Sequence, residues 1–204
     1  MTSQEPAGEW TRQQQWRRLA ICLLVVAVLV ALDLWSKQAV WSWLDPIEYD
    51  LERDAHGHHR YHVLGGSLTF MLNLNYGAAW GQGENFPYLL VGGRIAAAFL
   101  LLWLIWRTLP GQRMYLCALT MILAGALGNL YDNLFKPIEP ALGRVFGPVR
   151  DFIDVYFGIW DWHFPTFNVA DSCISVGAAL LLISGFGNQP EPEPEPEAGT
   201  DSAS

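Results

Sequence analysis

Acidic and amide side chains recur in five short segments that border very apolar stretches of this chain. Ionisable and amide groups are costly at the ends of apolar segments, so they are candidates for function rather than for packing. Carboxylates predominate among them, which predicts acid–base chemistry. In chain order the acids and amides, with a Lys and a Gly that accompany them, are Asp33 and Lys37, Asn75 and Gly77, Asn129 and Asp132, Asp151 and Asp154, and Asn168 and Asp171.

Asp151 and Asp171 are the most informative of these residues. In an extended stretch, Asp151 shares the apolar face with Val149 and Ile153, whereas Asp154 points to the other face. An acid on an apolar face needs a partner, and Asp171 follows after a connection that is able to fold back. Two carboxylates held close at low dielectric share one proton and titrate as a unit. Aspartic proteases use this arrangement to activate water.

Two simpler roles stay open for these residue types. Asn168 is a favourable helix N-cap, which places Asp171 near the third helical position, where a carboxylate suits the helix dipole. Asp171 is therefore also explained as a capping acid. Asp33 and Lys37 stand four residues apart, acid before base, and this order predicts an ion pair along one helix face.

The elements that must position these groups are four apolar blocks. The chain has 204 residues, of which 51% are hydrophobic and only 16% charged. Each block is long enough to cross a hydrocarbon core of about 30 Å as a helix. We therefore predict a mainly α membrane protein with four transmembrane helices, over about residues 19–36, 88–106, 114–131 and 167–186.

Two long connections join the blocks, over about residues 41–87 and 133–166. Each contains a stretch with period-two alternation, Thr69–Tyr76 in the first and Val149–Phe157 in the second, which is typical of strands. The two stretches are predicted to pair as a small extracytoplasmic β-sheet. The three Cys are an odd number and lie in apolar runs, which excludes a disulfide framework.

Charge near the span ends predicts the orientation. Three Arg precede the first block and two lie in the short connection Arg107–Arg113, which favours cytoplasmic N- and C-termini and outer long loops. Residues 1–18 then form a cytoplasmic segment, 19–186 the membrane domain and 187–204 a disordered Pro/Glu tail. The first block also resembles a cleaved signal peptide, but without a convincing cleavage site a retained span is favoured. Much of the net charge of −8 comes from the tail, and nothing indicates nucleic-acid binding.

A cluster of His56, His58, His59 and His62 raises the question of a metal site. No Cys or placed carboxylate completes a ligand set, and nearby Arg53 would repel a cation. A solvated loop is therefore the preferred interpretation, and no metal or other cofactor is expected.

Five motifs, in order, resemble the signature segments of the lipoprotein signal peptidases (signal peptidase II). They are DLWSK at 33–37, NYGAAWG at 75–81, GALGNLYD at 125–132, VRDFID at 149–154 and FNVADS at 167–172. The resemblance covers roughly residues 18–186 and includes all four apolar blocks.

The resemblance implies a multi-pass aspartic endopeptidase of the bacterial inner membrane, with its active site near the outer face. Such an enzyme cleaves prolipoproteins before the diacylglyceryl-modified Cys, without metal or covalent intermediate, and a monomer is expected. Its catalytic pair corresponds to Asp151 and Asp171. Its supporting and substrate-binding residues correspond to Asp33, Lys37, Asn75, Gly77, Asn129, Asp132 and Asn168.

The chain departs from the family pattern in three places. Asn133 stands where the family usually has Arg, and Arg144 or Arg150 is a candidate to replace it. Trp80 stands where Phe is common, and residues 45–62 look like an insertion. Arg94, inside the second block, either faces the site or extends to the lipid headgroups.

One alternative of a different class remains, a non-catalytic small transporter with a polar Asp/Asn site. Transporters more naturally show internal repeats or helices broken at mid-bilayer, whereas here the polar residues gather at span ends.

Overall fold

The computed structural model describes residues 10–51, 53, 59–78, 81–138 and 143–186. The predicted tail, 187–204, and most of the predicted N-terminal segment lie outside these residues. The elements are α1 (Arg12–Leu44), η1 (Asp45–Asp50), β1 (Tyr61–Leu64), β2 (Leu68–Asn75), α2 (Pro87–Arg107), α3 (Arg113–Phe135), β3 (Val149–Phe157), β4 (Trp162–Phe167) and α4 (Val169–Phe186).

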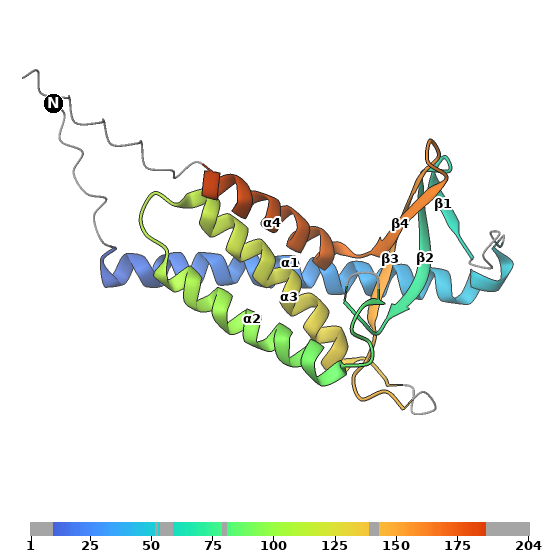
Figure 1. The fold of residues 1–204 in the computed structure, drawn as a ribbon, viewed down its shortest axis with the longest axis horizontal. Helices are drawn as coiled ribbons and strands as arrows, with labels where there is room; N and C mark the ends of the chain where they lie inside the picture. The colour runs from blue at the N-terminus through green and yellow to red at the C-terminus, as the bar shows by residue number, and fades with distance from the viewer. Residues whose placement is uncertain (1–9, 52, 54–58, 79–80, 139–142, 187–204) are drawn as a thin grey trace, which may run out of the picture.

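Four helices form a bundle in which α3 contacts each of the other three (Figure 1). Among the described residues, α1, α2 and α3 are long and apolar enough to cross a membrane, and α4 is a shorter apolar helix. The predicted helical membrane protein is thus confirmed. The first helix is longer than its apolar block: its 33 residues extend past the bundle and support the sheet.

Glycines bring α3 and α4 into close contact. A Cβ at Gly125 would collide with the carbonyl oxygen of Ala170, and one at Gly177 would lie 2.8 Å from the carbonyl oxygen of Ala118. The backbones of the two helices therefore meet, as small residues allow in membrane bundles. Gly92 of α2, in contrast, faces open space.

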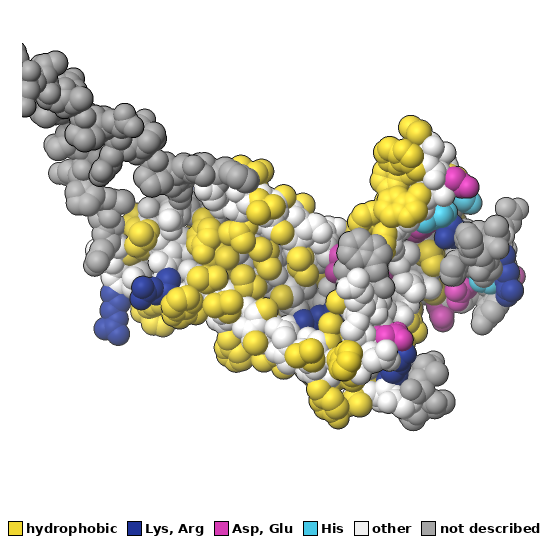
Figure 2. Space-filling model, in the orientation of Figure 1, with side chains coloured by type: hydrophobic (Ala, Val, Ile, Leu, Met, Phe, Trp, Pro, Cys, Tyr) yellow, Lys and Arg dark blue, Asp and Glu magenta, His cyan; other side chains and the backbone are white. Residues whose placement is uncertain are grey.

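Large apolar side chains cover the outside of the helices (Figure 2). Leu24 of α1, Phe99 of α2 and Leu182 of α4 are 66%, 70% and 67% exposed. Such a surface is costly in water and is the one expected against lipid tails.

At one end of the bundle lies an antiparallel sheet in the order β1-β2-β3-β4. The predicted pairing of the two alternating stretches is confirmed, with Asn73 of β2 opposite Asp151 of β3. Register shifts on both sides of β3 give β2 and β4 an extra residue each, which bends the neighbours around β3. The strands β1 and β4 were not predicted, because their sequences show no clear alternation.

The opposite end holds the start of α1, the end of α4 and the α2–α3 connection (Figure 1). There the buried guanidinium of Arg18 donates to the carbonyl oxygens of Ile105 and Trp106, at 2.9 and 2.8 Å. It therefore neutralises the partial negative charge at the C-terminus of α2.

Candidate functional site

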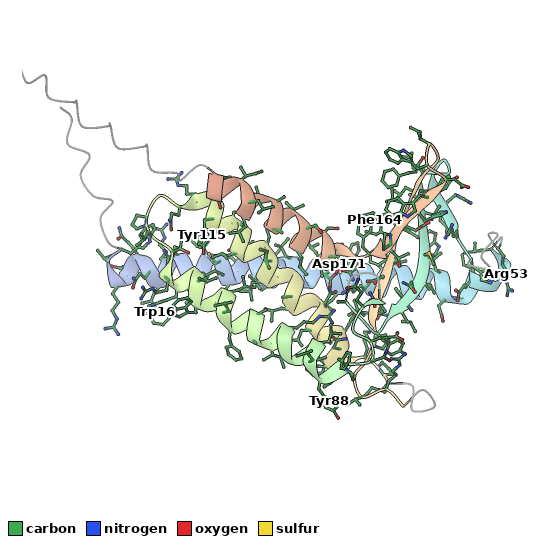
Figure 3. All side chains as sticks on the ribbon, viewed as in Figure 1. Trp16, Arg53, Tyr88, Tyr115, Phe164 and Asp171 are labelled. Carbon is green, nitrogen blue, oxygen red and sulfur yellow. The ribbon has the colours of Figure 1, made fainter. Side chains whose placement is uncertain are left out.

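Asp171 lies in the first turn of α4, where this helix meets the sheet (Figure 3). The backbone N–H of Asp171 donates to Asn168 Oδ1 at 2.9 Å, and the N–H of Asn168 donates back to Asp171 Oδ2 at 3.2 Å. This reciprocal pair is a capping box, so the capping role predicted for Asn168 is confirmed. The other carboxylate oxygen, Asp171 Oδ1, takes no part in the cap and accepts a hydrogen bond from Asn129 Nδ2 at 2.7 Å.

Asp151 lies on β3 and is 1% exposed. Its carboxylate accepts hydrogen bonds from Asn168 Nδ2 at 2.6 Å and from Asn75 Nδ2 at 3.0 Å. Burial, together with the negative charge of nearby Asp171, raises the pKa of Asp151 to about 7. The second carboxylate therefore makes ionisation of the first costly, as expected for an interacting pair.

Asn168 and Asn129 join the two acids. Asn168 contacts Asp151 through its side chain and Asp171 through its backbone. Asn129 Oδ1 accepts from Asn168 Nδ2 at 3.2 Å while its amide nitrogen holds Asp171. The tertiary structure therefore brings together the carboxylates that were predicted to pair. We call Asp151 and Asp171 the dyad.

Lys37 and Asp33 support the dyad from α1. The predicted ion pair is present, with Lys37 Nζ 2.7 Å from Asp33 Oδ2, and both side chains are buried. Lys37 also donates to Asn129 Oδ1 at 3.0 Å, which fixes the amide orientation of Asn129. Asp33 Oδ1 accepts from the backbone N–H of Ala170 at 2.8 Å, so it caps the first turn of α4.

Asp132, at the end of α3, anchors β3 next to the dyad. Its carboxylate accepts from the backbone N–H of Arg150 at 3.1 Å and pairs with Nη2 of the same residue at 3.0 Å. Lys37 lies 3.4 Å from Asp132 on the other side. These buried charges are paired, which is the condition for keeping them at this depth.

Gly77 shapes the turn that presents Asn75. Its N–H donates to Asn75 Oδ1 at 2.8 Å, and this bond directs Asn75 Nδ2 toward Asp151. A Cβ at Gly77 would collide with the backbone of Gly81, so no other residue fits without moving the turn. Trp80 lies outside the described residues.

The residues around Asn133 differ from the expectation. Of the two candidates to replace the family's Arg, Arg150 pairs with Asp132 at the same end of α3, and Arg144 lies over the ring of Tyr76 at 4.5 Å, but among the described residues neither donates to the Asn133 side chain. Arg94 of α2 does: its guanidinium donates to Asn133 Oδ1 and, at 3.4 Å, to the carbonyl oxygen of Gly77. Of the two alternatives for Arg94, the structure selects the one facing the site.

Asp154, on the other face of β3, is equally buried but has different neighbours. It accepts from Thr69 Oγ1 at 2.6 Å, and His163 Nδ1 lies 3.0 Å away. Arg60 Nε is 3.4 Å from the same carboxylate. This cluster was not predicted, because its partners come from three other strands or their flanks.

The His-rich stretch does not assemble a metal site within the described residues. His59 Nδ1 lies 3.0 Å from the carbonyl oxygen of Leu51, and Arg53 Nε donates to His59 Nε2 at 3.0 Å. His62 is exposed on β1. His56 and His58 lie outside the described residues.

Fold and site together define a multi-pass membrane protein with a buried carboxylate pair where its bundle meets a small sheet. Comparison with known families gives a more specific assignment. The model of the family described as signal peptidase (SPase) II matches residues 25–187. The chain belongs to this peptidase family.

Individual relatives agree with the family assignment. The chain is 38% identical over 172 residues to the lipoprotein signal peptidases of Yersinia pseudotuberculosis serotype O:1b (strain IP 31758) and Yersinia pestis (strain Pestoides F). In each case 80% of this chain and 85% of the relative are covered.

Solved structures show the same fold. A bacterial membrane enzyme determined by the in meso method at 2.3 Å superposes with a TM-score of 0.64 at 22% identity, covering 94% of this chain and 100% of that one. Another, at 1.9 Å, gives a TM-score of 0.60 at 22% identity, covering 91% and 100%.

Proposed function

We propose that this chain is an aspartic endopeptidase that removes signal peptides from prolipoproteins, cutting before the diacylglyceryl-modified Cys. Family membership supports the substrate class. The observation that carries the catalytic assignment is the pairing of Asp151 and Asp171 through Asn168. A pair of carboxylates linked by an amide, where the bundle meets the sheet, can activate water to hydrolyse a peptide bond.

The chemistry divides between the two acids. Asp151, whose pKa is raised to about 7 by burial and by the charge of Asp171, keeps the shared proton up to near-neutral pH. Asp171, the other member of the dyad, serves as the base, and it is oriented by hydrogen bonds from Asn129 and from the N–H of Asn168. Asp171 takes a proton from water, and the water oxygen attacks the scissile carbonyl. Asp151 gives its proton to the developing oxyanion. As the C–N bond breaks, Asp171 passes the proton it took from water to the leaving nitrogen, and Asp151 takes back a proton from the hydroxyl that becomes the new carboxyl group.

The amides around the dyad have supporting roles. Asn75 and Asn168 hold Asp151, and Asn129 orients Asp171. Lys37 and Asp33 keep α1, Asn129 and the start of α4 in register. The turn at Gly77 lies beside Asn75, where the substrate backbone would pass close to the dyad.

The membrane brings the substrate to the site. The signal helix and acyl chains of a prolipoprotein partition into the bilayer, which concentrates the scissile bond near the outer ends of the helices. We place the sheet and dyad at the outer face of the inner membrane and both termini in the cytoplasm, as the Arg distribution favours. Since one chain supplies both acids and their amides, we expect a monomer to be active.

The decisive experiment follows cleavage of a lipidated precursor by the purified protein in lipid vesicles. Asp151→Asn and Asp171→Asn each remove one acid at nearly constant shape and should lower kcat by about 10³-fold or more. Asp154→Asn is the matched control, because it changes an equally buried acid of the same strand. It should keep near-normal kcat per folded molecule. Full processing by both dyad variants would reject the assignment.

A further inference from the structure

Arg94 is a cation in an unusual place. It is the eighth residue of α2, so its Cα lies about 10 Å along the helix from the start at Pro87. Its side chain is half-buried. A guanidinium at such a position is costly and normally pairs with an acid or marks a functional site.

The contacts of Arg94 join two backbone segments that flank the dyad. One N–H group donates to Asn133 Oδ1, and another donates to the carbonyl oxygen of Gly77 at 3.4 Å. Asn133 in turn donates to the carbonyl oxygen of Gly147 at 2.8 Å, in the segment that leads into β3. Gly77 belongs to the turn that aims Asn75 at Asp151. Arg94 thus connects both sides of the site.

The charge of Arg94 is used differently from the other cations nearby. Lys37 forms a buried ion pair with Asp33, and Arg150 forms one with Asp132. Arg94 has no ion pair among the described residues, and the oxygens it contacts belong to neutral groups. The carboxylates that it attracts at longer range are those of Asp171, Asp151 and Asp132.

The ion pairs Asp33–Lys37 and Asp132–Arg150 cancel, so the singly protonated dyad keeps one negative charge, which Arg94 offsets from within the cluster. With one proton on the dyad there are three negative charges and three positive ones; without Arg94 the buried cluster carries a net negative charge. The charged groups that face the site are Asp33 and Lys37 from α1, Arg94 from α2, Asp132 from α3, Arg150 and Asp151 from β3, and Asp171 from α4. Half-buried Lys136, at the C-terminus of α3, lies at the edge of this group and acts on Asp132.

We propose that Arg94 is a positioning residue of this site, which supplies the counter-charge of the singly protonated dyad and holds the Gly77 turn in place. This rests on the proposed peptidase function. Only Arg combines the two roles, because a forked guanidinium reaches two acceptors and carries a charge as well, whereas Lys would supply the charge alone. Arg94 of α2 thereby supports chemistry performed by Asp151 of β3 and Asp171 of α4.

The test compares variants that separate charge from hydrogen bonding, in vesicles, on a lipidated precursor. Arg94→Gln removes the charge and should lower kcat on the order of 10-fold. Losing a nearby cation makes ionisation of the dyad harder, so the alkaline limb of the kcat–pH profile should move to higher pH. Arg94→Lys keeps the charge and should leave that limb in place. Arg144→Gln, which removes a cation that lies beside Tyr76 and pairs with Glu84, is the control and should behave as the unmodified protein.

A charge relocation makes the test sharper. Since the side chains of Arg94 and Asn133 meet, the exchange R94N/N133R moves the guanidinium from α2 to α3 within the same space. It should recover activity relative to R94N alone, and it should return the alkaline limb toward its original position. N133R alone brings two guanidinium groups together and should be less active than the unmodified protein.

Two outcomes would overturn the inference. In one, Arg94→Gln keeps normal kcat and an unshifted profile. In the other, Arg94→Gln and Arg94→Lys are equally impaired with no shift, which indicates a purely structural link. These two outcomes reject the role of Arg94, and leave the peptidase function standing, when Asp151→Asn is inactive in the same assay. Cleavage by Asp151→Asn and Asp171→Asn would instead reject the peptidase function itself.

Discussion

Asp151 and Asp154 lie three residues apart on β3, and each is 1% exposed, yet their surroundings are opposite in kind. Asp151 meets amides and a second acid, which raises its pKa to about 7. Asp154 meets a hydroxyl, an imidazole and a guanidinium, from Thr69, His163 and Arg60. One face of β3 therefore carries Asp151, which can exchange a proton near neutral pH. The other face carries Asp154, whose negative charge is balanced by neighbouring cationic and hydrogen-bonding partners.

The comparison shows that burial alone does not identify a reactive acid. Cations and hydroxyl donors stabilise the ionised form and make the carboxylate a structural element. Amides orient a carboxylate without adding positive charge, and a neighbouring acid then determines its protonation. The same rule separates Asp33 and Asp132, which are paired with Lys37 or Arg150, from the dyad.

The largest expected difference is in stability. Asp154→Asn leaves the Arg60 and His163 side chains without their carboxylate and should lower the free energy of unfolding by about 3 kcal/mol. At pH 4, Asp151→Asn should change it by less than about 1 kcal/mol, because an amide there replaces an acid that is protonated in the folded protein and about half protonated in the unfolded chain. Thermal unfolding in detergent measures both. Equal losses would mean that the two faces of β3 do not differ as described.

Gly125→Ala should disturb the dyad and spare the Asp154 cluster. The added methyl collides with Ala170 and lies 2.6 Å from Ile174, both on α4, so the helix that carries Asp171 must move. Overpacking of this kind costs about 2 kcal/mol, and cleavage should fall by about 10-fold or more. Gly92→Ala is the control, since that site faces open space. Normal cleavage by Gly125→Ala would show that the position of Asp171 is not critical.

The pH dependence of stability should come from the dyad face. The pKa of Asp151 is raised from 3.8 to about 7, so between these values the folded protein binds more protons than the unfolded chain. Stability from this group therefore falls as pH rises from about 4 to 7, by roughly 4 kcal/mol, and then stays level. Asp151→Asn should lose this dependence and become more stable than the unmodified protein at pH 8. Unfolding at pH 5 and pH 8 compares the two; identical slopes would contradict the raised pKa.

The smallest effect is expected from Thr69→Val. It removes one neutral donor from Asp154, 2.6 Å away, while His163 and Arg60 remain. The free energy of unfolding should fall by about 1 kcal/mol, and cleavage per folded molecule should stay normal. A strong loss of cleavage would show that the Asp154 face takes part in the reaction.

Local patterns allowed much of the fold to be predicted. The apolar blocks indicated the helices, and period-two alternation indicated β2 and β3, because burial of a repeating face leaves a repeating sequence. The strands β1 and β4 lack such a pattern. In β4, Pro165 coincides with the register shift against β3, which interrupts any alternation.

The site divides in the same way. The Asp33–Lys37 pair and the cap between Asn168 and Asp171 depend on spacings of four and three residues, which a helix fixes by itself. The partner of Arg94 was not predictable: α2 and α3 are separate helices, and only their packing sets which side chain reaches Asn133.

The sequence by itself determined a membrane-embedded helical protein, the order of its polar segments and, through their resemblance to signal peptidase II, the two acids to examine. These features are local, since they depend on composition, periodicity and motif order. Only the tertiary structure decided that Asp151 faces amides and an acid while Asp154 faces cations. Those partners lie up to 94 positions away in the chain, on other strands and helices, and their meeting depends on the packing of α4 on α3 and on the pairing of four strands.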